Sequence, residues 1–248
     1  MVAEQRIIAA PRLTPFVGAV IATNAAVFVL LHILSAVSQE AFQLAERTIY
    51  LTPALVLRGW VWQLFTHAFA HFDFLHIFLN MAILYLFGCR MESVLGTRQF
   101  ARLYFFGVLG SGVLCVLVPF LPGIGGQALF RVMVLGASGA VFAVCVTYAC
   151  MFPNDIIYVF LLVPMRAKWA VLLFVAVAFL GLISAGRGNI ANQAHLGGAL
   201  FGYIFYKWQI QSPPWGGGGP RWHWPRRRKK PLTDIDRRFR EIAKELRR

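Results

Sequence analysis

Long uncharged stretches recur along most of the chain. Six runs of 16 to 28 residues contain no Asp, Glu, Lys or Arg. A membrane-crossing helix needs ~20 predominantly apolar residues, and the shortest run reaches that length if its helix begins near His71. Apolar positions are continuous rather than alternating, which favours helices over the strands of a barrel. The pattern predicts an all-α bundle of six transmembrane helices, whose runs are bounded by Arg12 and Glu40, Asp73 and Arg90, Arg102 and Arg131, Arg131 and Asp155, Lys168 and Arg187, and Arg187 and Lys207.

Two of the connections between these runs are distinctive. The first outer connection, roughly residues 39–62, is long and contains Trp60 and Trp62, which suit a membrane interface. The connection 152–167 is apolar over residues 156–163. We expect this second connection to lie along the membrane surface.

The composition agrees with a membrane protein. Of 248 residues, 58% are hydrophobic and 14% charged, whereas a soluble domain is about half apolar and a quarter charged. A soluble globule, a disordered chain and a disulfide scaffold are therefore excluded. The four cysteines lie in or beside apolar runs and form no C-x-x-C pattern. We interpret them as packing residues rather than zinc ligands or a redox pair: Cys89, Cys115, Cys145 and Cys150.

The distribution of basic residues indicates the orientation of the spans. Six spans bring both termini to one side, and Lys and Arg favour the cytoplasmic side. With cytoplasmic termini, 20 of the 24 Lys and Arg lie inside and four outside; without the 12 in residues 221–248 the bias is still 8 to 4. We therefore expect cytoplasmic termini and a multi-pass protein of the bacterial inner membrane.

Gly, Pro and basic residues dominate after residue 211. We expect four parts: a cytoplasmic N-terminal segment 1–13, a six-span domain 14–211, a Gly/Pro/basic linker 212–231, and a basic amphipathic tail 232–248. In a membrane protein such a tail favours anionic lipid headgroups, and no nucleic acid is expected. A solvated tail that only enforces topology is the alternative. The tail's apolar positions fall at helical spacing: Ile235, Phe239, Ile242 and Leu246.

Polar residues inside the spans are the functional candidates. In this topology spans two, four and six all run from outside to inside, so their N-terminal ends gather at the outer face. His76 and Asn80 lie in the first turns of span two, Ser138 in those of span four, and His195 in those of span six. The topology alone therefore predicts that these four residues lie at similar depth.

Ser138 and His195 together indicate nucleophilic catalysis. Small residues flank Ser138, and Gly198 and Gly202 follow His195, so a helix-packing motif is the alternative interpretation. A histidine, however, activates a serine by taking its proton. None of the six acidic residues before the tail falls at the depth of His195. We therefore expect a Ser–His dyad, with an imidazole oriented by packing or stacking.

His76 and Asn80 are four residues apart and share one helical face. We interpret them as an oxyanion hole, to which the backbone N–H of Ser138 adds a third donor. Hydrogen bonding between helices is the alternative. A metal site that includes His67 and His71 is disfavoured because H-E-x-x-H is absent and no carboxylate completes the set. No metal and no cofactor are expected.

At these residues the chain resembles the rhomboid intramembrane serine proteases. Gly136, Ser138 and Gly139 match the family's G-x-S-G. His195, with Gly198 and Gly202, matches its A-H-x-x-G-x-x-x-G. A further motif, H-x-x-x-x-H-x-x-x-N, is matched by His71, His76 and Asn80, and an acidic-to-glycine stretch by Glu92 and Gly96. The resemblance covers roughly residues 14–208 and leaves the tail outside.

The resemblance implies a six-helix protease with Ser138 as nucleophile, His195 as base and then acid, and His76 and Asn80 as oxyanion donors. Substrates would be membrane-anchored proteins that enter between spans two and five and are cut near the outer end of a transmembrane helix. His71 would help to shape the cavity. The chain departs from the family at Phe142, where a tyrosine commonly stacks on the histidine, because phenylalanine stacks but makes no hydroxyl contact.

A second departure is Gln63, where the family often has arginine; we expect looser polar anchoring of the outer connection. Two alternatives to the protease stay open. One is a non-catalytic rhomboid-like protein that binds membrane helices, as in quality control. The other is a channel or transporter, which the lack of internal repeats disfavours.

Overall fold

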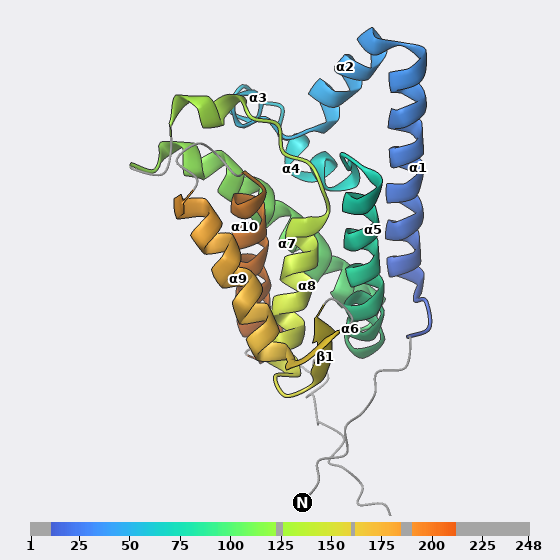
Figure 1. The fold of residues 1–248 in the computed structure, drawn as a ribbon, viewed down its shortest axis with the longest axis vertical. Coiled ribbons are helices and arrows are strands. Elements are labelled where there is room, and N and C mark those ends of the chain that lie inside the picture. Colours follow the sequence, from blue (N-terminus) through green and yellow to red (C-terminus); the bar gives the residue numbers. More distant parts are fainter. Residues whose placement is uncertain (1–10, 123–125, 160–161, 185–189, 212–248) are drawn as a thin grey trace, which may run out of the picture. The chain divides into compact units, whose positions relative to one another are not determined.

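The computed structural model describes residues 11–122, 126–159, 162–184 and 190–211 (Figure 1). The predicted linker 212–231 and tail 232–248 lie outside these residues, as does most of segment 1–13. Helices dominate the described part. Those that precede the candidate serine are α1 (Pro15–Val37), α2 (Gln39–Ile49), α3 (Pro53–Val56), α4 (Gln63–Thr66), η1 (His67–Phe69), α5 (Phe74–Ile83), η2 (Leu84–Gly88), α6 (Cys89–Leu95), α7 (Thr97–Leu117), η3 (Val118–Phe120) and η4 (Gln127–Arg131).

The elements from Ser138 onward are three longer helices, a two-stranded sheet and a final π-helical segment. In chain order they are α8 (Ser138–Met151), β1 (Ile156–Val159), β2 (Val163–Arg166), α9 (Ala167–Ser184), α10 (Ile190–Phe205) and η5 (Tyr206–Gln211). In Figure 1 the N-terminal ends of α5, α8 and α10 lie toward one end of the bundle, and the two strands lie at the other. We call these the dyad end and the hairpin end.

Within the described residues, three helical segments are long and apolar enough to cross a membrane: Pro15–Val37, Phe74–Leu95 and Thr97–Phe120. The second is continuous because α5, the π-helical turn η2 and α6 follow one another without a break. Ser138–Met151 and Ala167–Leu182 are apolar but shorter. Span four is shorter than its uncharged run because the residues before Ser138 are not helical. The fold is thus a largely helical membrane bundle, and the count of six spans stays a prediction.

Glycines allow α7, α8 and α10 to pack closely. A Cβ at Gly198 of α10 would lie 1.9 Å from the carbonyl oxygen of Gly139, and one at Gly202 would lie 2.5 Å from that of Ala143. On the other side of α10, a Cβ at Gly197 would lie 2.3 Å from the carbonyl oxygen of Gly110 in α7. The small residues after His195 therefore bring its helix into backbone contact with α8, as membrane helices commonly do.

The connection between α8 and α9 is a β-hairpin, so the prediction of an all-α chain is wrong at this point. β1 and β2 pair antiparallel, with Ile156 opposite Arg166 and Val159 opposite Val163. Ile157 and Val159 are buried and Tyr158 is exposed, which is the alternation of a half-buried strand. The pattern was not visible in the sequence because the exposed position is also hydrophobic. Whether the hairpin lies along the membrane surface stays a prediction.

The first outer connection is firmly anchored, contrary to the expected effect of Gln63. The Gln63 side chain is fully buried. Its Oε1 accepts a hydrogen bond from the Thr52 N–H (3.0 Å), and its Nε2 donates to the Arg47 carbonyl (2.7 Å). The indole N–H of Trp62 donates to the carbonyl of Thr48 (3.0 Å). An amide both donates and accepts, so it ties two points of the connection together without a charge.

Glu92 joins the first helix to the second and third spans. Its buried carboxylate accepts hydrogen bonds from the N–H groups of Phe16 and Val17 (both 3.0 Å), from the Thr14 hydroxyl, and from the Thr97 hydroxyl (2.8 Å). The carboxylate thereby satisfies free N–H donors at the start of α1, where negative charge is favourable. Gly96 follows with φ +78°, a conformation that favours glycine.

Candidate active site

Ser138 and His195 come together between two helices. Ser138 is the first residue of α8, and His195 lies in the second turn of α10. The Nε2 of His195 is 2.8 Å from the Ser138 Oγ, although the residues are 57 positions apart in the chain. This is hydrogen-bond distance, the arrangement in which an imidazole accepts the proton of a serine hydroxyl.

Phe142 holds the imidazole from its face. One turn after Ser138 on α8, its ring is stacked on that of His195, with centroids 4.4 Å apart and an angle of 8° between the planes. The hydrogen bonds and ion pairs of the described residues give His195 no carboxylate partner. Among the described residues, the imidazole is therefore oriented by stacking on Phe142 and by the Ser138 hydroxyl, without a third polar group.

His76 faces the same region from α5. The Asp73 carboxylate caps this helix by accepting from the His76 N–H (2.8 Å). The Phe72 N–H donates to the Nδ1 of His76 (3.5 Å). A neutral ring that accepts at Nδ1 carries its proton on Nε2. The Nε2–H is therefore the free donor of this ring.

Gly136 lies directly against that donor. A Cβ at Gly136 would be 2.8 Å from the His76 Nε2 and 3.8 Å from the Ser138 Oγ. Its φ of +120° also favours glycine. Asn80, buried one turn further along α5, donates one amide hydrogen to the His76 carbonyl (2.9 Å) and keeps a second. Two helices, α5 and α8, thus bring His76 and Ser138 to one region, and Asn80 follows one turn after His76 on α5.

The strand-like segment before Ser138 is held by three other parts of the chain. Leu51 and Val134 exchange two backbone hydrogen bonds (2.9 and 2.8 Å). The Gly136 N–H donates to the His67 carbonyl (2.9 Å). The Ala137 N–H donates to the Nε2 of His71 (3.3 Å), so His71 supports the turn that presents the serine. Sequence reasoning missed Leu51 and Val134, whose apolar side chains do not reveal backbone pairing.

His67 and Ser111 form a buried polar pair beside this turn. The Nδ1 of His67 donates to the Gln63 carbonyl (2.9 Å), and the Ser111 hydroxyl, 3.3 Å away, donates to its Nε2. Burial lowers the pKa of His67 to about 4, so the ring is neutral and both bonds fit one tautomer. Ser111 was missed, although its glycine neighbours signal close packing; a Cβ at Gly139 would lie 2.3 Å from the Cβ of Ser111.

Metal ligands are not grouped in the described part of the chain. There, no three His, Cys, Asp or Glu side chains are arranged to hold an ion. Within it the imidazoles of His67, His71 and His195 instead make the hydrogen bonds given above. The chemistry available to the site is thus proton transfer, nucleophilic attack by a hydroxyl, and hydrogen bonding to a developing negative charge.

The fold and the site together define a helical membrane protein with a serine–histidine pair held between two helices. Residues 58–211 match the rhomboid domain, and the chain belongs to the rhomboid family. It is similar to RHOMBOID-like protein 12, mitochondrial, of Arabidopsis thaliana (33% identical over 149 residues; 57% of this chain and 44% of that protein). It is also similar to Rhomboid protein 1, mitochondrial, of Saccharomyces cerevisiae (32% over 148 residues; 58% and 40%).

A longer match is with the Presenilin-associated rhomboid-like protein, mitochondrial, of Mus musculus, 30% identical over 211 residues. It covers 79% of this chain and 51% of that protein, so the chain spans about half the length of the curated relatives it matches, or less. Their names place these relatives in mitochondria, and a further one in chloroplasts. The expected bacterial inner membrane therefore finds no support in these relatives, whereas a membrane protein does.

Proposed function

We propose that this chain is an intramembrane serine endopeptidase that cuts membrane-anchored proteins near the outer end of a transmembrane helix. The observation that carries the proposal is the 2.8 Å contact between the Ser138 Oγ and the His195 Nε2. It joins a hydroxyl and an imidazole at the start of two helices in a chain of the rhomboid family.

In the first half of the reaction, the Ser138 Oγ attacks the scissile carbonyl carbon while His195 takes the hydroxyl proton. The carbonyl oxygen becomes an oxyanion. The Nε2–H of His76, the second amide hydrogen of Asn80 and the N–H of Ser138 are its proposed donors. The last of these is free for the purpose because the first N–H groups of a helix have no intrahelical acceptor.

When the intermediate collapses, the C–N bond breaks and His195 gives its proton to the amine that leaves. A water molecule then attacks the acyl ester, its proton passes to His195, and the Ser138 hydroxyl is restored as the carboxyl product leaves. No acidic partner enters this scheme. Stacking on Phe142 takes over the orienting function that a carboxylate has in a Ser–His–Asp triad.

Six spans and cytoplasmic termini stay part of the proposal and account for where the substrate is cut. In that topology the first turns of α5, α8 and α10 lie near the outer face. The substrate would approach from the lipid between α5 and α9. The basic residues beyond 211 would contact anionic headgroups. The organelle names of the relatives make a mitochondrial or chloroplast membrane as reasonable a location as a bacterial one.

The test is covalent labelling of the purified protein with a small fluorophosphonate, with cleavage of a model transmembrane substrate measured in parallel. In labelling, the Ser138 Oγ forms a bond to phosphorus and fluoride leaves. We expect wild-type protein to be labelled and to cleave, and Ser138→Ala to do neither. A wild type that binds the substrate helix but neither labels nor cleaves would overturn the proposal in favour of a non-catalytic helix-binding protein.

A further inference from the structure

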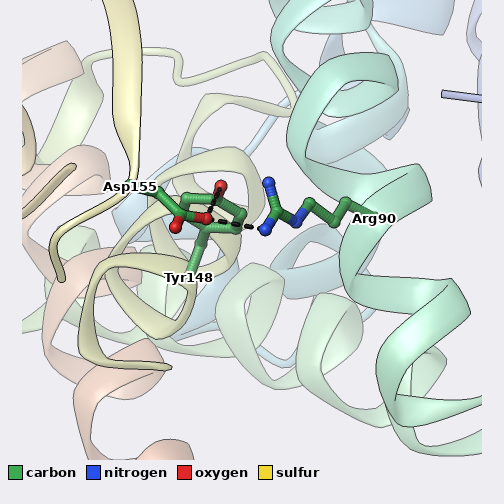
Figure 2. Close-up of polar contacts among 3 residues, drawn as sticks. All are labelled: Arg90, Tyr148 and Asp155. Carbon is green, nitrogen blue, oxygen red and sulfur yellow. Dashed lines mark hydrogen bonds and ion pairs between the residues drawn. The ribbon is translucent and has the colours of Figure 1, made fainter. Parts of the chain in front are cut away.

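At the hairpin end, far along α8 from the serine, a charged cluster joins three elements (Figure 2). The Nη2 of Arg90, on α6, is 2.7 Å from the Oδ2 of Asp155 in the α8–β1 connection. The Tyr148 hydroxyl, on the last turn of α8, donates to the same oxygen (3.0 Å). The Arg90 Cζ also lies 4.8 Å from the ring centroid of Phe152 and 5.4 Å from that of Tyr148. We call Arg90, Tyr148 and Asp155 the inner clamp.

The inner clamp reaches the start of α9 through the backbone of the same connection. The carbonyl of Asp155 accepts from the Ala167 N–H (2.8 Å), and the carbonyl of Pro153 accepts from the Lys168 N–H (3.3 Å). These are the first two residues of α9. Asp155 therefore uses its side chain to hold the second span and its backbone to hold the fifth.

Beyond its first two residues, α9 makes few contacts with the second span. It packs on α10, α8 and the two strands. Large apolar side chains in the half of α9 away from the hairpin are exposed, Phe179 and Leu180 among them, as are Phe74 and Phe78 on α5. In Figure 1 α8 lies between α5 and α9. Toward the dyad end, α5 and α9 thus expose apolar side chains, whereas at the hairpin end Arg90 and Asp155 form an ion pair.

We propose that Arg90 and Asp155 are positioning residues that fix the inner end of α9, so that a transmembrane substrate meets a preformed docking edge beside Ser138. The inference rests on the proposed function. A docking edge that is already in place binds more tightly than one that must be ordered on binding. Loss of the inner clamp should therefore raise the KM for a transmembrane substrate and leave the dyad, which α8 and α10 carry, unchanged.

The experiment compares Arg90→Glu, Asp155→Arg and the double variant, which restores opposite charges. Three quantities are measured for each variant: kcat and KM on a transmembrane substrate in liposomes, and the rate at which a small fluorophosphonate labels Ser138. Both side chains are about one-third exposed (28% and 34%), so solvent screens their attraction and the loss of the ion pair should have a modest effect. We expect KM to rise about threefold to tenfold in each single variant, labelling and kcat to stay within about twofold, and the double variant to recover.

Arg98→Glu is the matched control, because Arg98 is exposed on the next helix and has no ion pair within the described ranges. If charge reversal prevents folding, Arg90→Gln and Asp155→Asn, which remove charge with little change in size, decide the question. The inference is overturned if KM in the clamp variants equals that of Arg98→Glu or falls, or if labelling drops together with cleavage. An unlabelled, inactive wild type would instead contradict the proposed function.

Discussion

The two ends of α8 stabilise their surroundings in opposite ways. At the dyad end, Ser138, Phe142 and His195 associate through one hydrogen bond and one stacked ring pair, with no ion pair. At the hairpin end, Arg90 and Asp155 form a charge-assisted contact of 2.7 Å. A permanent charge beside the imidazole would favour one of its protonation states, and the imidazole has to use both. At the hairpin end no proton is transferred, so an ion pair can hold the elements together there. Variants at the dyad end should therefore change the rate of the chemical step, whereas variants at the hairpin end should change the binding of the transmembrane substrate.

The largest effect is expected at the dyad. Ser138→Ala and His195→Ala should each reduce cleavage of a transmembrane substrate at least ~10⁴-fold, because each removes one half of a unit that acts together. Both variants should still unfold cooperatively on heating, since neither substitution adds volume to the bundle. Substantial turnover by purified Ser138→Ala would contradict the assignment of the nucleophile.

The next largest effect is expected at the proposed oxyanion donors. Loss of one such donor costs ~10²–10³ in rate, so His76→Ala and Asn80→Ala should lower kcat by that factor or less, since three donors share the charge. KM should change little. Unchanged kcat in both variants would mean that this face of α5 serves packing alone.

Close packing of α10 on α8 should respond to a single methyl group. Gly198→Ala should destabilise the fold by about 1–3 kcal/mol, as overpacking commonly does, because its Cβ would lie 1.9 Å from the Gly139 oxygen. Thermal unfolding in detergent measures the change. Gly126→Ala is the matched control, since a Cβ there meets nothing within 4 Å. Equal stability of the two variants would mean that the helices are not in backbone contact.

A smaller effect is expected at the stacked ring. Stacking is worth ~0.5–1.5 kcal/mol beyond burial, so Phe142→Leu should slow fluorophosphonate labelling about twofold to tenfold. Phe142→Tyr keeps the ring and should label at nearly the wild-type rate. If Phe142→Leu labels as fast as Phe142→Tyr, the imidazole is oriented by something other than the ring.

The smallest effect is expected beyond the bundle. Truncation after Gln211 should leave cleavage in detergent unchanged, because every proposed catalytic group precedes it. A peptide of residues 212–248 should bind anionic vesicles and dissociate as salt rises. Equal binding to neutral and anionic vesicles would remove the electrostatic argument, and an inactive truncated enzyme would show that the tail is required.

The sequence by itself predicted those features that depend only on which residue types occur and where: the helices and the candidate site residues. Uncharged runs indicated the helices because buried backbone in lipid requires them. Ser138, His195, His76 and Asn80 stood out because polar side chains are rare in such runs. The proximity of Ser138 and His195 was predicted from the shared direction of three expected spans. The stacked Phe142 was expected from the resemblance to the rhomboid family, in which a tyrosine commonly stands at this position.

The tertiary structure decided what depends on partners distant in the chain. Gln63 anchors the outer connection only because Arg47 and Thr52 lie within its reach. Leu51 supports the serine turn through its backbone, which no side-chain pattern reveals. The hairpin was hidden by an exposed position that is also hydrophobic, since an apolar residue in a membrane protein can face lipid. In the sequence Arg90 and Asp155 only marked the ends of uncharged runs; they pair because the start of α6 lies beside the α8–β1 connection.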